Sequence, residues 1–136
     1  RKIDKAEQLI REGKLYIESK TECVSLSHIP VQTLKEASLI VNTTPIGMYP
    51  YENNLPPIAF ELLQPTQYIC DLIYNPLETQ FLAKAKLKGC KVVNGVGMLV
   101  HQGAKTFSLF TDKKAPIEEM RQVVLDYVSK SRKVLP

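Results

Sequence analysis

Short apolar runs alternate with segments of helical spacing along this chain of 136 residues, and this alternation limits the folds open to it. Three of the runs are typical of strands and lie at residues 39–41, 68–74 and 91–94. The run at 39–41 is wholly apolar, as expected for a strand that is buried on both faces. Strands that alternate with helices predict an α/β fold with a parallel sheet.

Five segments have the apolar spacing or boundary residues of helices: residues 2–12, 30–36, 75–89, 98–110 and the segment after Pro116. The third is expected to begin with Asn75 as N-cap, followed by Pro76, and to end at Gly89. In the last helix four residues are expected to face inward: Ile117, Met120, Val124 and Val128. A short run at 15–17 predicts a further strand, and four prolines within 45–58 predict a long loop.

Composition argues against several classes of function. The net charge of +4 is modest and the charges are spread out, which gives little support to nucleic-acid binding. No apolar run approaches the ~20 residues of a membrane span. Cys23, Cys70 and Cys90 are odd in number and form no C-x-x-C pair, so neither a disulfide framework nor a metal site is expected. We expect Cys70 to be a buried thiol and the protein to be cytoplasmic.

The ends of the three expected strands carry the most unusual residues. Ligands of parallel α/β sheets bind at the carboxyl ends of the strands. Those ends carry N-T-T at residues 42–44, Y-N-P at 74–76 and G-V-G at 95–97. The two glycines allow either close approach of a ligand or tight packing of the turn, and turn chemistry favours neither.

Single side chains near these ends give weaker signals. The amide of Gln102 can donate to and accept from a sugar-like hydroxyl, although a surface glutamine is the simpler interpretation. Asp71 is compatible with a catalytic acid, but a buried or capping aspartate is favoured. His28 and His101 lack partners at ligand spacing and are expected to be structural or exposed.

Three blocks of sequence resemble the shikimate dehydrogenase family. Residues 41–48, V-N-T-T-P-I-G-M, are similar to the family's N-[AT]-T-x-x-G-M stretch. Residues 71–76, D-L-I-Y-N-P, resemble its D-x-x-Y-x-P stretch. Residues 94–104, N-G-V-G-M-L-V-H-Q-G-A, resemble its N/D-G-x-G-M-L-x-x-Q-[GA]-A signature, which is the most specific of the three. The resemblance covers nearly the whole chain.

The resemblance implies an incomplete Rossmann-like, doubly wound parallel sheet that lacks its first strand and glycine-rich loop. Residues 1–136 would be the C-terminal portion of the NADP-binding domain. The N-terminal substrate domain, which holds the family's catalytic Lys and Asp, would be missing, so no catalytic residue is expected in this chain. We therefore expect the chain alone to be inactive and to bind NADP weakly or not at all.

The resemblance also implies roles for individual residues in reducing 3-dehydroshikimate to shikimate with NADPH, a step of aromatic amino-acid biosynthesis. Gln102 and Tyr74 would contact the substrate. Leu72, Gly95 and Met98 would line the nicotinamide end of the cofactor, and Thr44 would lie near its ribose. The cations Arg1, Lys2 and Lys5 would approach the 2′-phosphate of NADP. A homodimer is compatible with the resemblance.

Three other interpretations stay open. The first is a quinate/shikimate dehydrogenase with broader substrate use or with NAD. The second is a non-catalytic nucleotide-binding module or remnant. The third is a part of a multifunctional polypeptide of the aromatic pathway.

Overall fold

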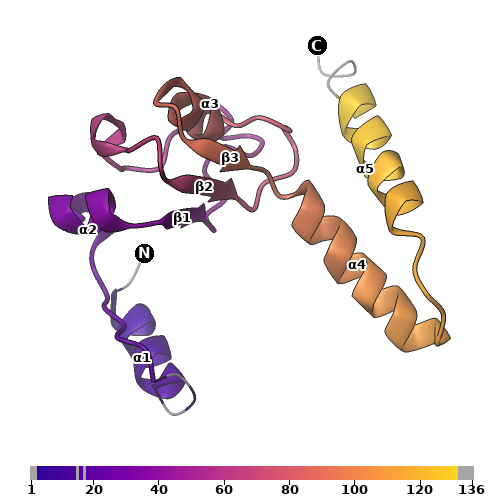
Figure 1. Ribbon diagram of the computed structural model, residues 1–136, viewed down its shortest axis with the longest axis horizontal. Helices are drawn as coiled ribbons and strands as arrows, with labels where there is room; N and C mark the ends of the chain where they lie inside the picture. The colour runs from indigo at the N-terminus through magenta and orange to yellow at the C-terminus, as the bar shows by residue number, and fades with distance from the viewer. Residues whose placement is uncertain (1–2, 15, 17, 132–136) are drawn as a thin grey trace.

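A computed structural model describes residues 3–14, 16 and 18–131 of the chain, and a three-stranded parallel sheet lies at its centre (Figure 1). The strands, in spatial order, are β1 (Leu39–Asn42), β2 (Tyr68–Asp71) and β3 (Lys91–Val93). The helices are α1 (Ile3–Gly13), α2 (Val31–Glu36), α3 (Gln80–Leu87), α4 (Val96–Thr111) and α5 (Ile117–Ser131), with 3₁₀ turns η1 (Leu26–His28) and η2 (Phe60–Leu62). The predicted parallel α/β sheet is confirmed.

One face of the sheet forms the core. The strand register aligns Ile40, Ile69 and Val92 on this face, and Ile69 is fully buried. Helix α3 packs over them, with its buried residues at helical spacing: Phe81, Leu82 and Ala85. The ring of Phe60 meets that of Phe81 edge-on, with 6.0 Å between centroids. Burial of this face is the main source of stability for the sheet.

The opposite face of the sheet is uncovered in the described part of the chain. Leu39, Val41 and Val93 alternate onto this face and are 57%, 42% and 52% exposed. The expectation that residues 39–41 are buried on both faces is therefore wrong here, because none of the described helices packs over this side. Lys91 lies across the ring of Tyr68 on the same face, with its Nζ 4.8 Å from the centroid.

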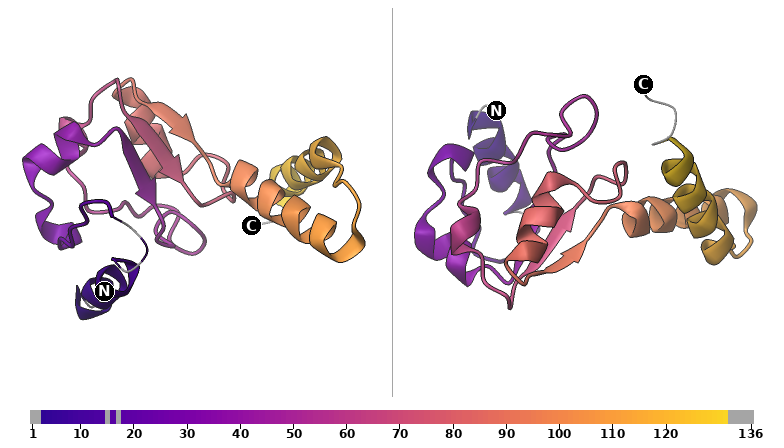
Figure 2. Two further views of the ribbon diagram at one scale, coloured as in Figure 1. Left: turned by 60° about the horizontal axis from the view of Figure 1, so that its bottom comes forward. Right: turned by 90° about the horizontal axis from the view of Figure 1, so that it is seen from above.

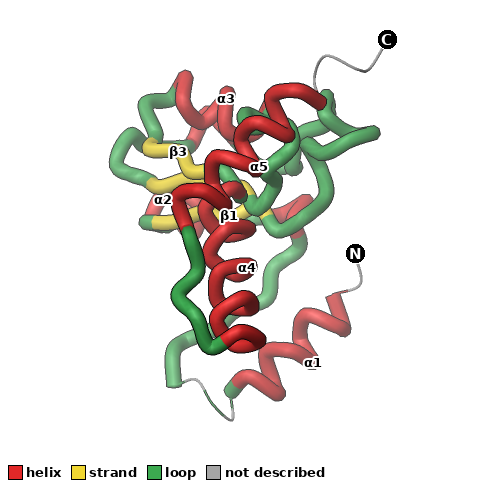
Figure 3. The backbone as a smooth tube through the Cα atoms, turned by 90° about the vertical axis from the view of Figure 1, so that its right-hand side faces the viewer, coloured by secondary structure: helices red, strands yellow, loops and turns green. Residues whose placement is uncertain are grey.

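Helices α4 and α5 form an antiparallel hairpin that extends away from the end of the sheet (Figures 1 and 2). Val100 and Ala104 of α4 and Val128 of α5 are buried. Ile117, Met120 and Val124 are half-buried, so the predicted inward face of α5 is confirmed. Seen from the side of the hairpin, α4 and α5 lie in front of the sheet, and α1 lies below the sheet (Figure 3).

Several boundaries differ from the sequence predictions. Helix α1 forms where it was expected, but no residue of it is buried. The expected strand at 15–17 falls largely outside the described residues, and Tyr16 lies in an exposed turn. Strand β2 ends at Asp71 rather than at residue 74, and α4 begins at Val96 rather than at residue 98.

The start of α3 was predicted wrongly at Asn75. The helix begins at Gln80, and the hydroxyl of Thr79 accepts a hydrogen bond from the Leu82 amide at 3.3 Å, so Thr79 is the N-cap. The preceding segment is held as a turn by a distant residue, since Asn94 Nδ2 donates to the Leu77 carbonyl at 3.0 Å. A tertiary contact thus overrides a local start signal. The predicted end of the helix, before Gly89, is confirmed.

A buried glutamine joins α2 to β2. Gln67 is 2% exposed, and its Nε2 donates to the carbonyls of Leu34 at 2.7 Å and Ala37 at 2.8 Å. Its Oε1 accepts from the Gln64 amide at 2.8 Å. The carbonyls at the end of a short helix have no partners within the helix, and Gln67 supplies them. No pattern in the sequence around Gln67 marks it as buried.

We predict that Gln67→Leu destabilises the fold by about 2–4 kcal/mol, because it removes the donor for two carbonyls and leaves the Gln64 amide unpaired. Gln80→Leu, at an exposed position, is the matched control and should change stability by less than about 0.5 kcal/mol. Equilibrium urea unfolding measures both. Equal effects of the two substitutions would contradict the prediction.

Candidate functional site

The three polar strand ends singled out in the sequence lie side by side. The Leu72 amide donates to the Asn42 carbonyl at 3.1 Å, which extends the β1–β2 pairing beyond β2. The Gly95 amide donates to the Ile73 carbonyl at 2.9 Å, which joins the turn after β3 to the same edge. The carboxyl ends of all three strands therefore form one continuous edge, as expected for a ligand crevice in a parallel sheet.

A buried carboxylate organises this edge. Asp71 is fully buried, and its Oδ1 accepts from Asn42 Nδ2 and from the Ile73 amide, both at 3.1 Å. Its Oδ2 accepts from Thr79 Oγ1 at 2.7 Å. Hydrogen bonds to both oxygens compensate the loss of water that burial imposes on the carboxylate. The expectation of a buried aspartate at residue 71 is confirmed.

The amide of Asn42 extends this network into the loop after β1. Its Nδ2 also donates to the Ile46 carbonyl at 3.2 Å. Its Oδ1 accepts from the backbone amide of Thr44 at 3.0 Å and from Thr44 Oγ1 at 2.7 Å. The Thr44 hydroxyl in turn accepts from the Ile46 amide at 3.3 Å. Residues 42–46 are thus fixed by side chains on the buried side of the edge.

Asn42 and Thr79 were not predicted as parts of the network. Asn42 is a buried polar residue that ends an apolar strand, and such a residue needs partners. The sequence placed Asn42 at the polar end of an expected strand, but its spacing did not identify Asp71 as the partner.

The two glycines of the G-V-G turn have different roles. A Cβ on Gly95 would overlap the carbonyl of Leu72, so glycine is needed there for the close approach of two backbones. A Cβ on Gly97 would meet no heavy atom within 4 Å in the described structure. Tight packing therefore accounts for Gly95, whereas Gly97 has open space beside it at the start of α4.

The predicted substrate contacts are accessible from solvent. Tyr74 is 39% exposed in the segment after β2, and Gln102 is exposed in the second turn of α4. The Gln102 Nε2 donates to the Leu99 carbonyl at 3.1 Å, which leaves one N–H and the amide oxygen for other partners. Both side chains can therefore reach a ligand.

The predicted cofactor contacts at the edge differ in their exposure to solvent. Met98 is 51% exposed, Leu72 and Thr44 are half-buried, and Gly95 is buried. Arg1 and Lys2, predicted for the 2′-phosphate, lie outside the described residues. Lys5 is exposed on α1, which stands apart from the sheet in Figure 1, so the structure does not bring it to the strand ends.

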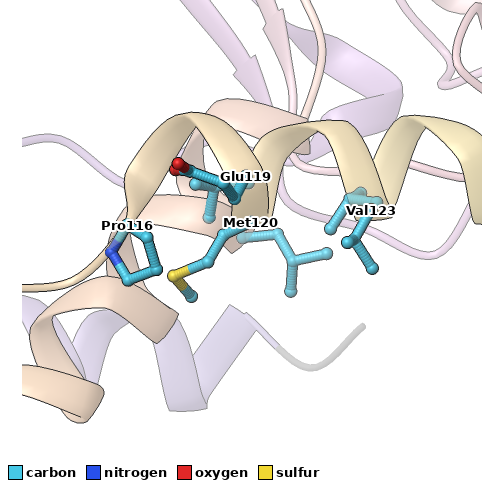
Figure 4. A pocket seen from close by; sticks show the side chains of 7 residues that line it. Pro116, Glu119, Met120 and Val123 are labelled. Carbon is cyan, nitrogen blue, oxygen red and sulfur yellow. The ribbon is translucent and has the colours of Figure 1, made fainter.

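Two cavities in the described structure are candidates for a ligand site. One of about 640 Å³ runs along β1 and reaches the polar residues 42–44 at one end, with an otherwise mostly apolar lining. Its size is that of a small-molecule pocket. The other, of about 490 Å³, lies between α4 and α5, where Pro116, Glu119, Met120 and Val123 line it (Figure 4). We favour the first as a ligand site because it includes strand-end polar groups.

Other reactive groups do not form a second site in the described chain. No group of three His, Cys, Asp or Glu residues there could hold a metal ion.

Burial, together with the nearby charge of Asp71, raises the pKa of the Cys70 thiol above its ordinary value. Cys70, half-buried rather than fully buried as expected, therefore stays protonated near neutral pH and is a poor nucleophile. His28 and His101 are exposed, as expected. None of the helices in the described ranges is both long and apolar enough to cross a membrane.

Known proteins match both the sequence and the fold. The family model of the shikimate 5′-dehydrogenase C-terminal domain matches residues 95–125. A shikimate dehydrogenase (NADP(+)) of Methanopyrus kandleri is 39% identical over 129 residues, which are 94% of this chain and 44% of that protein. A shikimate dehydrogenase solved in complex with NADP+ is 36% identical with a TM-score of 0.85, over 94% of this chain and 45% of the other.

A Listeria monocytogenes shikimate 5-dehydrogenase, solved with shikimate and NAD, is 26% identical with a TM-score of 0.81, over 89% of this chain and 43% of the other. The chain thus spans a little under half the length of the relatives that it matches. Its sheet is part of a Rossmann-like fold, which confirms the predicted fold class. The chain belongs to the shikimate dehydrogenase family and corresponds to a C-terminal part of its members.

Proposed function

We propose that the chain is the cofactor-side part of an NADP-dependent shikimate dehydrogenase, which interconverts 3-dehydroshikimate and shikimate. The observation that carries this proposal is the convergence of residues 42–44, 72–74 and 95–98 at one edge of the sheet. These segments lie at the carboxyl ends of all three strands and fall within the three blocks that resemble the family. In this proposal residues 1–136 are the C-terminal portion of the NADP-binding domain.

The residues at the edge fit a dinucleotide. Thr44 offers a hydroxyl at the polar end of the cavity along β1, for the ribose. Leu72 and Met98 supply apolar surface for the nicotinamide end, beside Gly95. The open space at Gly97 admits a flat group close to the start of α4, where the backbone N–H groups point outward. NADP, when bound, supplies or receives the hydride.

In this proposal the chain holds the substrate in place, and it does not supply the group that donates a proton to the substrate or accepts one from it. Gln102 and Tyr74 have the exposed polar groups for hydroxyls of shikimate. Asp71 accepts hydrogen bonds on both oxygens inside the protein, so it is not available as an acid or base. We assign the catalytic Lys and Asp to an N-terminal substrate domain of the same polypeptide.

Uncovered apolar surfaces support such an additional domain. The sheet face of Leu39, Val41 and Val93 is exposed, and so are Leu109 and Phe110 of α4 at 74% and 87%. The relatives continue well beyond the matched region, since the chain covers 44% of the Methanopyrus kandleri protein. Further polypeptide of this kind would bury these surfaces and supply the glycine-rich loop.

Other parts of the proposal rest on the sequence alone. Arg1, Lys2 and Lys5 stay the predicted contacts of the 2′-phosphate. The homodimer and the cytoplasmic location stay predictions as well.

The nearest alternative is a dehydrogenase that uses NAD or quinate. The observation in its favour is that the Listeria monocytogenes relative was solved with NAD together with shikimate. A non-catalytic nucleotide-binding remnant is the alternative outside catalysis.

A dehydrogenase assay on the polypeptide extended to the length of its relatives tests the proposal. Shikimate and quinate are each combined with NADP and NAD, and formation of the reduced cofactor is followed. Turnover confined to shikimate and NADP is the expected result. Turnover with quinate or NAD supports the broader enzyme, and a folded protein without turnover supports the remnant.

We predict that Gln102→Leu lowers kcat/KM for shikimate by about 10- to 100-fold, because hydroxyls of the bound substrate lose a hydrogen-bonding partner. The Kd of NADPH, measured by fluorescence titration, should stay within about twofold. Gln122→Leu on exposed α5 is the control and should leave both values unchanged. An unchanged kcat/KM in Gln102→Leu would remove Gln102 from the substrate site.

We predict opposite effects on stability for the two glycines. Gly97→Ala should stabilise the protein by up to about 1 kcal/mol, because alanine is the better helix former and has room there. Gly95→Ala should destabilise it by about 3 kcal/mol through overlap with the Leu72 carbonyl. Urea unfolding measures both changes.

Gly97→Ala should also weaken NADPH binding several-fold, since its methyl group occupies the proposed ligand space. Tighter or equal NADPH binding by Gly97→Ala would show that no cofactor group lies beside Gly97.

A further inference from the structure

The buried network at the strand ends fixes the hydrogen-bonding character of Thr44, the residue proposed for the ribose. The chain of contacts runs from the Asp71 carboxylate to the Asn42 amide and from there to the Thr44 hydroxyl. Asp71 and Asn42 are buried, at 0% and 5% exposure, whereas Thr44 is half-buried at the wall of the cavity along β1. A buried group thus controls a group at the ligand surface.

Only one orientation of the Asn42 side-chain amide fits its hydrogen-bond partners. Its Nδ2 lies between two acceptors, the Asp71 carboxylate and the Ile46 carbonyl, at 3.1 and 3.2 Å. Its Oδ1 faces the Thr44 backbone N–H, which can only donate. A flipped amide would set oxygen against two acceptors and NH₂ against a donor, so the contacts exclude it.

This orientation decides what Thr44 can do. Because Asn42 Oδ1 is an acceptor, the Thr44 hydroxyl uses its single proton in the 2.7 Å bond to it. One lone pair of the same oxygen accepts from the Ile46 amide. What remains is a second lone pair, so the hydroxyl can accept from a ligand but has no proton left to donate.

We propose that Asp71 and Asn42 are positioning residues that hold Thr44 Oγ1 as an acceptor for a donor group of the dinucleotide. A ribose hydroxyl or a carboxamide NH₂ meets this requirement, whereas a phosphate oxygen, which only accepts, does not. The inference rests on the proposed function because it takes a dinucleotide as the ligand. It deepens that proposal by assigning the donor and acceptor roles of one contact.

Thr79, which also bonds to Asp71, offers a control substitution within the same network. Asp71 Oδ1 faces Asn42, whereas Oδ2 faces Thr79, which caps α3. A substitution at Thr79 removes a buried bond of the same carboxylate and leaves the connection from Asn42 to Thr44 in place. Thr79→Val therefore measures general loosening, separately from loss of the acceptor.

The test measures the NADPH Kd by fluorescence titration in the polypeptide extended to the length of its relatives, with urea unfolding of each variant. We expect Thr44→Val to raise Kd about threefold to tenfold and Thr44→Ser to restore it. Asn42→Ala should raise Kd as much as Thr44→Val does. The double variant should be no weaker than Thr44→Val, because both remove the same interaction. Thr79→Val should unfold at lower urea while keeping the wild-type Kd.

Three results would overturn the positioning role. These are additive effects of Asn42→Ala and Thr44→Val, an equal rise in Kd with Thr79→Val, and wild-type affinity in Thr44→Val. If Asn42→Ala does not fold, the comparison of Thr44→Val with Thr44→Ser and Thr79→Val still decides between loss of an acceptor and loosening. A folded wild-type protein that binds neither NADPH nor NADH refutes the proposed function itself, which is a different result from wild-type binding that ignores Thr44.

Discussion

The buried carboxylate of Asp71 is the constraint on which the rest of the strand-end edge depends. A charge without access to water must be hydrogen-bonded, and here its donors come from three parts of the chain: Asn42 at the end of β1, the Ile73 backbone after β2 and Thr79 before α3. Satisfying one side chain therefore brings together the loop at 42–46, the segment at 72–74 and the start of α3. The candidate site consists of the outer surface of these same segments.

The second constraint is the close approach of backbones at Gly95. Its amide bonds to the Ile73 carbonyl, and the space for a side chain is taken by the Leu72 carbonyl. This contact joins α4, which carries Gln102, to the edge organised by Asp71. The hydrogen bonds of Asp71 and the close backbone packing at Gly95 thus involve neighbouring residues. Together they hold the proposed cofactor contacts next to the proposed substrate contacts.

The exposed apolar surfaces follow from the same architecture. A parallel sheet needs cover on both faces, and the described helices cover one. The α4–α5 hairpin projects away from the sheet (Figure 2), and few of its residues are buried: Val96, Val100, Ala104 and Val128. The relatives that this chain matches are about twice as long, and in our proposal the remainder of the polypeptide would cover both surfaces.

Local sequence determined most elements, because apolar periodicity and boundary residues such as glycine and proline act over a few residues. The elements α1, β1, β3 and the inward face of α5 lie where their patterns predicted. The three blocks of sequence that resemble shikimate dehydrogenases also identified the family. Only the tertiary structure decided where α3 begins, because Asn94 and Asp71 hold residues 75–79 from outside the segment. It alone also separated the roles of Gly95 and Gly97 and assigned the proton of Thr44. These depend on which groups meet across the fold, and spacing along the chain does not contain that information.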